Sequence, residues 1–170
     1  MYKIENILNT LLEYKALHEE FSQTELNQQW TEKLGEINGM LEGTISAIRE
    51  SVIANGGKVP DLRSFGKEGI EAFPVTHLDN LTLLKRMIKD RLFRTREVTH
   101  GSKYYFIGNA IRSVEKALHI CANLIANRDI YFQQEDFKEK LNDIASKEIK
   151  PLVQYTEQLI KQAHEAERII

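Results

Sequence analysis

The stretch LNQQWTEKLGEINGMLEGTISAIRESV, residues 26–52, places an apolar residue at almost every third or fourth position. This spacing matches the 3.6-residue turn of an α-helix and gathers the apolar side chains on one face. The residues of this face are Leu26, Trp30, Leu34, Ile37, Leu41, Ile45, Ile48 and Val52. We therefore predict a long helix that buries one stripe and ends near Asn55, Gly56 and Gly57, which tolerate positive φ.

The preceding residues predict a separate helix over residues 2–21. Ser22 followed by Glu25 has the capping-box pattern, in which each side chain satisfies a free backbone N–H in the first turn of a helix. We therefore expect a break near Ser22 and the start of the long helix there. The apolar residues of the first helix are Ile4, Ile7, Leu8, Leu11, Leu12 and Phe21.

Three glycines recur at four-residue spacing in the long helix, at Gly35, Gly39 and Gly43. At about 100° per residue they lie away from the apolar stripe, so we do not expect a glycine zipper in the core. Each interior glycine costs about 1 kcal/mol relative to alanine. These glycines therefore mark either a bent or weakly specified surface face or the close approach of another backbone.

The apolar spacing in the rest of the chain also predicts helices, and no stretch alternates apolar and polar residues as a strand would. Between Gly56 and Asn80 we expect one short helix with Phe65, Ile70 and Phe73 against the bundle. Asp79 is the predicted N-cap of a helix that runs toward Thr95, with Leu81, Leu84, Ile88 and Leu92 inward. Further helices are expected over residues 103–127, around Phe137 to Ile144, and from Pro151, the last either separate or continuous through a kink.

The predicted fold class is an all-α, single-domain bundle of five to six helices over residues 1–170. The N-terminus lacks a secretory signal and no stretch approaches the 18 apolar residues of a membrane span, so we expect a cytoplasmic protein without membrane contact. Cys121, the single cysteine, is in register with apolar neighbours and is expected to be a buried, reduced thiol.

Positive charge gathers in one segment although the net charge is only −2. Residues 85–103 hold seven Lys/Arg against two Asp/Glu, a balance of +5. Arginine suits bidentate contact with phosphate, and nearby tyrosines offer stacking surfaces for single-stranded RNA. A basic run near a helix C-terminus also favours the helix dipole, so a solvated helix end is the alternative. The candidate RNA-binding residues are Lys85, Arg86, Lys89, Arg91, Lys103, Tyr104 and Tyr105.

Short motifs of metal and nucleotide enzymes are absent, including the Walker A loop, the dinucleotide fingerprint, GxSxG, HExxH and paired CxxC. A di-iron bundle needs two ExxH helices, and Glu97 to His100 is the only match. We therefore expect neither a metal nor a cofactor.

The run from Arg94 to Gly101, RTREVTHG, has the form R-x5-H-G and follows an amphipathic helix in a small all-α chain. It resembles the HEPN superfamily, whose signature is an arginine, usually followed by a polar residue, and a histidine four to six positions later. The likeness covers the motif and a helix–turn–helix frame over residues 79–127. The asparagine that the family favours after the arginine is Thr95 here.

The resemblance implies a homodimer in which two motifs line one cleft and cleave RNA without a metal. His100 would then be the acid/base and Arg94 the phosphate ligand, with Arg96 as a competing candidate. In a straight helix Arg94 and His100 point about 120° apart, so they converge only if the chain turns or the partner protomer supplies one of them. The resemblance also suggests a toxin or anti-phage role and a protein antitoxin as partner.

A second interpretation is a non-enzymatic helical module for protein–protein interaction. Such a module would hold a protein partner through the basic helix or through the glycine-lined acidic face of residues 35–47.

Overall fold

The computed structural model describes residues 2–54, 61–63, 68–95 and 103–168, with side chains except at positions 2–3, 15–23, 90–95 and 167–168. Every regular element in these ranges is a helix, and no strand occurs among them. The predicted all-α bundle is confirmed.

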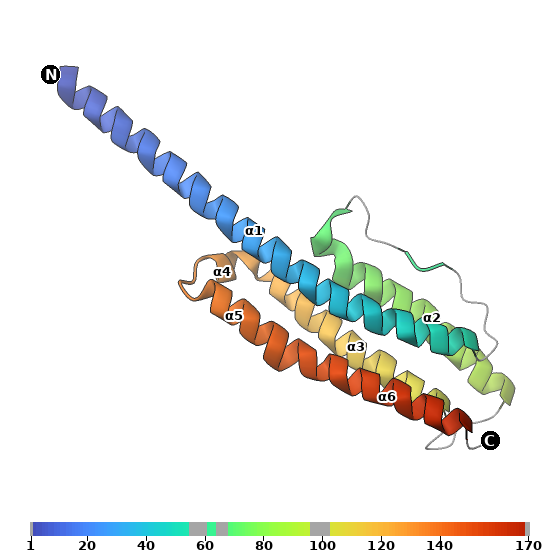
Figure 1. Cartoon of the computed structure of the whole chain (residues 1–170). Coiled ribbons are helices and arrows are strands. Elements are labelled where there is room, and N and C mark those ends of the chain that lie inside the picture. Colours follow the sequence, from blue (N-terminus) through green and yellow to red (C-terminus); the bar gives the residue numbers. More distant parts are fainter. Residues whose placement is uncertain (1, 55–60, 64–67, 96–102, 169–170) are drawn as a thin grey trace.

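The first helix, α1 (Tyr2–Ala54), is continuous over 53 residues, and the break predicted at Ser22 is wrong. No proline or glycine stands between Tyr2 and Leu34 to interrupt it. Serine and threonine in a helix interior cost less than about 1 kcal/mol each, so a capping pattern alone does not end a helix. The C-terminal part of α1 lies in the bundle, and the N-terminal part extends beyond it (Figure 1).

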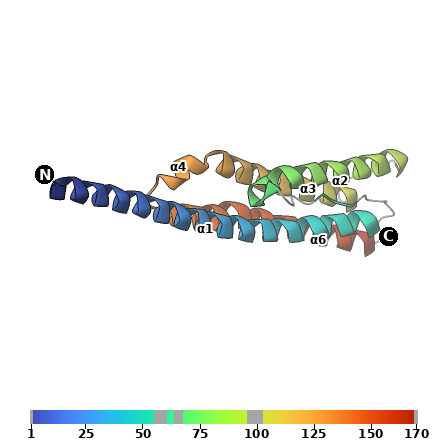
Figure 2. The ribbon, with the colours of Figure 1, turned by 90° about the horizontal axis from the view of Figure 1, so that it is seen from above.

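The bundle consists of four long segments in two layers. They are the second half of α1, α2 (Phe73–Thr95), α3 (Lys103–Ala126) and a C-terminal run that ends with α6 (Lys150–Arg168). α1, α2 and α6 run in one direction and α3 in the opposite one (Figure 1). α1 and α6 form one layer and α2 and α3 the other (Figure 2). α3 makes its most extensive contacts with α6 and then with α2, and it also contacts α1.

The core confirms the predicted apolar stripes. Every predicted residue of the stripe from Trp30 to Val52 is buried, and Leu26 packs partly buried against the same core. Leu92 lies outside the described side chains. The other long segments contribute Leu81, Leu84, Ile88, Ile107, Ile111, Val114, Leu118, Cys121, Phe137, Leu141, Val153, Leu159 and Ile160.

α2 begins at Phe73, so the prediction that Asp79 caps it is wrong. Phe73 is fully buried and anchors the first turn, whereas Asp79 is exposed six residues later. Pro74 suits this first turn because a proline lacks the N–H that would have no partner there. The 3₁₀ turn η2 (Ile70–Ala72) precedes α2, and Phe65 lies outside the described residues.

The C-terminal run is continuous from α5 (Phe137–Asp143) through the π-helical segment η3 (Ile144–Ile149) into α6. The continuous alternative for Pro151 is therefore correct. A proline ring crowds the carbonyl four residues earlier, and a wider π turn just before it accommodates that crowding. The short helix α4 (Arg128–Phe132), which precedes this run, was not predicted.

A polar and aromatic cluster holds η2 and α4 against α1. The Trp30 Nε1–H donates to Oε1 of Glu71 at 2.8 Å, and the same oxygen lies 3.2 Å from Nη1 of Arg128. The Arg128 guanidinium lies 4.9 Å from the Phe132 ring centroid, and the Phe132 and Trp30 rings make a T-shaped contact with their centroids 5.6 Å apart. This cluster stands where α1 leaves the bundle (Figure 1).

The three glycines of α1 allow a prediction about the stability of the fold. Gly35, Gly39 and Gly43 are exposed, and a Cβ built at each meets no atom within 4 Å. The alternative of a close backbone approach is therefore not observed among the described residues. We expect Gly39→Ala to raise the free energy of unfolding by about 0.5–1 kcal/mol, because alanine loses less backbone entropy in a helix. Urea unfolding followed by circular dichroism measures the change.

Gly69→Ala is the matched control, because Gly69 has a φ of 87° and an alanine there is strained. We expect this variant to lower the free energy of unfolding by about 1 kcal/mol or more. A loss of stability in Gly39→Ala would contradict the interpretation of an open, solvated face.

Candidate nucleic-acid interface

The HEPN-like motif falls between two antiparallel helices. α2 ends at Thr95 and α3 begins at Lys103, and the two helices pack side by side in opposite directions (Figure 1). The chain therefore reverses its direction between Thr95 and Lys103, in the part of the sequence that contains His100.

The motif side chains themselves lie outside what the structure describes. Arg94 and Arg91 belong to α2, but their side chains are not among the described ones. Arg96 and His100 lie outside the described residues. The described part of the interface is therefore its border, formed by the end of α2 and the first turn of α3.

One of the predicted phosphate contacts is already neutralised. Nζ of Lys85 lies 2.6 Å from Oε1 of Glu115 on α3, with 46% of the lysine side chain exposed. An exposed ion pair contributes little to stability, but it offsets the lysine charge toward a phosphate. Thirty positions separate these two residues in the sequence, and no local sequence pattern predicts the pair.

Exposed cations remain on both helices of the border. Arg86 and Lys89 are exposed on α2, one and four positions after Lys85. Lys103 is partly exposed in the first turn of α3, with its ammonium 5.2 Å from the Tyr104 ring centroid. Charges placed in this way would attract an anionic polymer and would do so less at high salt.

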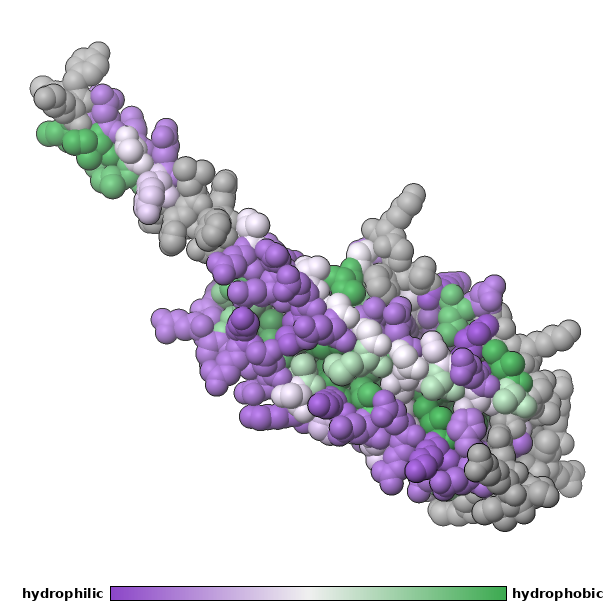
Figure 3. Space-filling model, in the orientation of Figure 1, coloured by the Kyte–Doolittle hydropathy of each residue, from purple (hydrophilic) through white to green (hydrophobic). Residues whose placement is uncertain are grey.

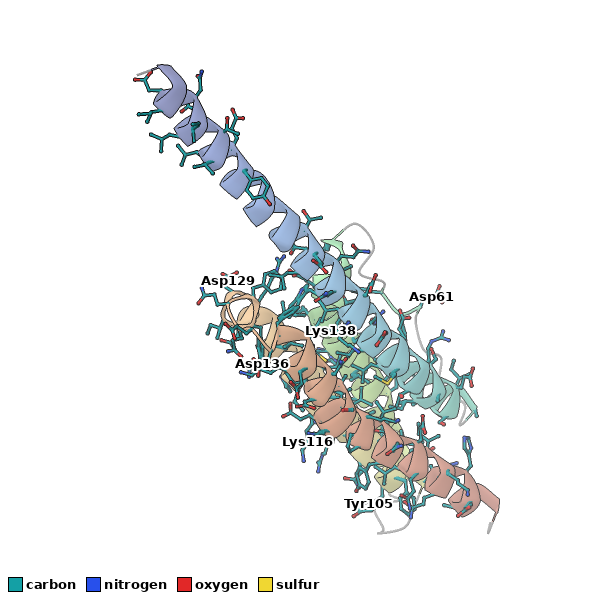
Figure 4. The ribbon with its side chains drawn as sticks, turned by 60° about the vertical axis from the view of Figure 1, so that its left-hand side comes forward. Asp61, Tyr105, Lys116, Asp129, Asp136 and Lys138 are labelled. Atoms are coloured by element: carbon teal, nitrogen blue, oxygen red, sulfur yellow. The ribbon has the colours of Figure 1, made fainter. Side chains whose placement is uncertain are left out.

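The two neighbouring tyrosines have different environments. Tyr104 is only 6% exposed and packs in the core, so its ring is not available for stacking on a base. Tyr105 is 42% exposed, and its ring makes a T-shaped contact with the Phe106 ring, with the two ring centroids 5.6 Å apart. Figure 4 shows Tyr105 at the end of the bundle where α3 begins. Tyr105 is thus the tyrosine of this pair that can stack on RNA.

No group of three or more His, Cys, Asp or Glu side chains that could hold a metal ion occurs in the part of the chain that the structure describes. Among the described helices none is long and apolar enough to cross a bilayer. Cys121 is buried, and burial raises the pKa of its thiol to about 12.

Comparison of the chain with protein-family models, with curated proteins and with solved structures finds no match.

A buried polar pair joins α1 to α2 away from this interface. His77 is 4% exposed, and its Nε2 lies 2.7 Å from Oδ1 of Asn38. Because an amide oxygen only accepts, Nε2 carries the proton in this pair. Burial lowers the pKa of His77, and the carboxylate of Glu42 opposes that shift to a smaller extent. His77 is therefore a neutral core residue near pH 7.

This burial makes stability depend on pH. The pKa of His77 is lower in the folded chain than its ordinary value of 6.5, so the unfolded chain binds the proton more readily. We expect the free energy of unfolding to fall as the pH drops below 6.5, by at most about 1.4 kcal/mol per pH unit from this residue. His77→Gln should flatten this dependence in urea unfolding, whereas the matched variant of an exposed histidine, His119→Gln, should keep it. Equal slopes in all three proteins would contradict the assignment.

Proposed function

We propose that this chain binds RNA at the end of the bundle where α2 meets α3 and cleaves it there without a metal, as a HEPN-like endoribonuclease. The reversal of the chain between Thr95 and Lys103 carries the proposal, because convergence of Arg94 and His100 needs a turn and the chain turns in the segment that contains His100. The exposed cations Arg86 and Lys89 support it, since they give the end of α2 a positive surface.

The residues of the motif match the chemistry of RNA cleavage. A histidine with a pKa near neutrality takes the proton from the 2′-hydroxyl, whose oxygen then attacks the neighbouring phosphorus. The bond from phosphorus to the 5′-oxygen breaks, and that oxygen takes up a proton, which leaves a 2′,3′-cyclic phosphate and a 5′-hydroxyl. An arginine stabilises the negative charge that develops on the phosphate. In this proposal His100 moves the proton, and Arg94 or Arg96 binds the phosphate.

The same proposal includes the partners that the resemblance implies. A homodimer would bring two motifs into one cleft, and a toxin or anti-phage role would call for a protein antitoxin. Both remain part of the proposal.

Cleavage is the first test. We expect purified protein to cut single-stranded RNA in the presence of a chelator and His100→Ala to lower the rate by about 100-fold or more, as loss of a general acid/base does. Arg94→Ala and Arg96→Ala, compared side by side, identify the phosphate ligand as the one whose loss matters more. Retention of a native circular dichroism spectrum excludes misfolding, and unchanged cleavage by His100→Ala would refute the catalytic role.

Binding is tested separately from cleavage by using the His100→Ala chain. Arg86→Ala and Lys89→Ala should each weaken binding to single-stranded RNA and reduce the slope of log K against log salt by about 0.7. Lys138→Ala is the matched control, since Lys138 is exposed on α5 (Figure 4). Equal effects of all three substitutions would contradict an interface at the end of α2.

A specific observation also favours the second candidate, a protein-interaction module. The N-terminal part of α1 exposes a row of large apolar side chains outside the bundle (Figure 3). RNA binding does not need such a row, so a protein contact made there would be separate from the proposed RNA site.

A further inference from the structure

The N-terminal part of α1, which we call the arm (residues 2–24), extends beyond the bundle as a helix (Figure 1). The large apolar side chains that the structure describes in the arm are 55–71% exposed, whereas those of α1 from Trp30 to Val52 are almost all buried. In Figure 3 they appear as an apolar patch at the tip of the arm. These side chains belong to Ile4, Ile7, Leu8, Leu11, Leu12 and Tyr14.

A helix of this kind depends on a partner for its apolar face. Isolated helices of 12–15 residues are marginal in water, and helices in proteins draw most of their stability from packing of an amphipathic face. The bundle does not cover these side chains. An apolar stripe exposed to this extent is typical of a surface that another molecule covers.

We propose that the arm of a second copy of this chain covers it, so that two arms pack antiparallel around a two-fold axis. A fully exposed large side chain has a surface of about 200 Å². The six exposed side chains of the stripe together therefore expose about 700 Å² per copy. Each partner in a standard interface buries about 800 Å². The stripes of two arms thus supply most of the area that a stable dimer needs, without any third component.

The order of charges along the arm favours the antiparallel orientation. In an antiparallel pair we place Leu8 of one copy opposite Leu12 of the other. Glu5 of each copy then lies beside Lys15 of its partner. A parallel pair would instead set each of these charges beside its own like charge. Unlike charges at the border of a helix pair select orientation, and like charges disfavour it.

The composition of the arm also distinguishes among occupants. Its first 15 residues carry Lys3 and Lys15 against Glu5 and Glu13, which is no net charge from side chains. A helix that lies on an anionic membrane or binds RNA carries an excess of Lys and Arg on its polar face. The arm has no such excess, which leaves an apolar protein surface as its partner.

This interface is independent of the proposed RNA site. The arm leaves one end of the bundle, and α2 meets α3 at the other end (Figure 1). Pairing through the arms therefore leaves both RNA sites at the outer ends of the dimer. A cleft shared by two motifs would need a second contact between protomers.

The mass of the full chain in solution tests the proposal. Sedimentation equilibrium from micromolar to tenths of millimolar protein should give twice the chain mass of 19.7 kDa. Leu8→Glu combined with Leu11→Glu should weaken association at least tenfold, and the bundle should remain folded because both side chains are exposed. Val75→Glu and Tyr155→Glu, at exposed apolar positions of the bundle, are matched controls that should stay dimeric.

Charge exchange tests the orientation. Glu5→Lys alone should weaken the dimer, and Glu5→Lys combined with Lys15→Glu should restore it. A single-chain mass for the unmodified protein, or a dimer that survives the Leu8 and Leu11 substitutions, would overturn the proposal. Failure of the double charge variant to recover would overturn the antiparallel arrangement. His100→Ala should leave the mass unchanged, so a failed nuclease and a failed dimer give different results.

Discussion

Burial of one apolar stripe of α1, from Trp30 to Val52, is the interaction on which the rest of the structure depends. The stripe lies against α2, α3 and α6, and the side chains of those helices pack around it. Most of the stability of a helix in water comes from such packing and not from its own hydrogen bonds. The cluster of Trp30, Glu71 and Arg128 closes the bundle at the point where this burial stops.

The same helix has two environments, and the two proposed contacts lie at opposite ends of the bundle. Its C-terminal half is covered by this chain, whereas its N-terminal half exposes apolar side chains that need another surface. The basic end of α2 lies at the far end of the bundle (Figure 1). A protein contact and an RNA contact can therefore be made at opposite ends, and neither needs to change the packing between them.

Tertiary packing also decides which charged and aromatic side chains of the basic segment face solvent, where RNA could contact them. Lys85 and Arg86 are adjacent, yet Lys85 faces Glu115 of α3 and Arg86 is exposed. Tyr104 and Tyr105 are adjacent as well, and packing of α3 buries the first and exposes the second. Successive residues on a helix point about 100° apart, so one of two neighbours faces the core and the other does not.

The sequence by itself determined the helical class and most of the core, because apolar residues at 3.6-residue spacing can be buried together only on a helix face. It also determined the position of the R-x5-H motif after an amphipathic helix.

Only the tertiary structure decided that α1 runs through Ser22, that α2 begins before Asp79 and that α5 continues into α6. An N-cap residue contributes about 1 kcal/mol and a proline inside a helix costs about 3 kcal/mol, and packing over a whole helix outweighs both. Tertiary structure alone also placed Glu115 beside Lys85 and left the arm uncovered, since contacts between helices far apart in the chain have no local pattern.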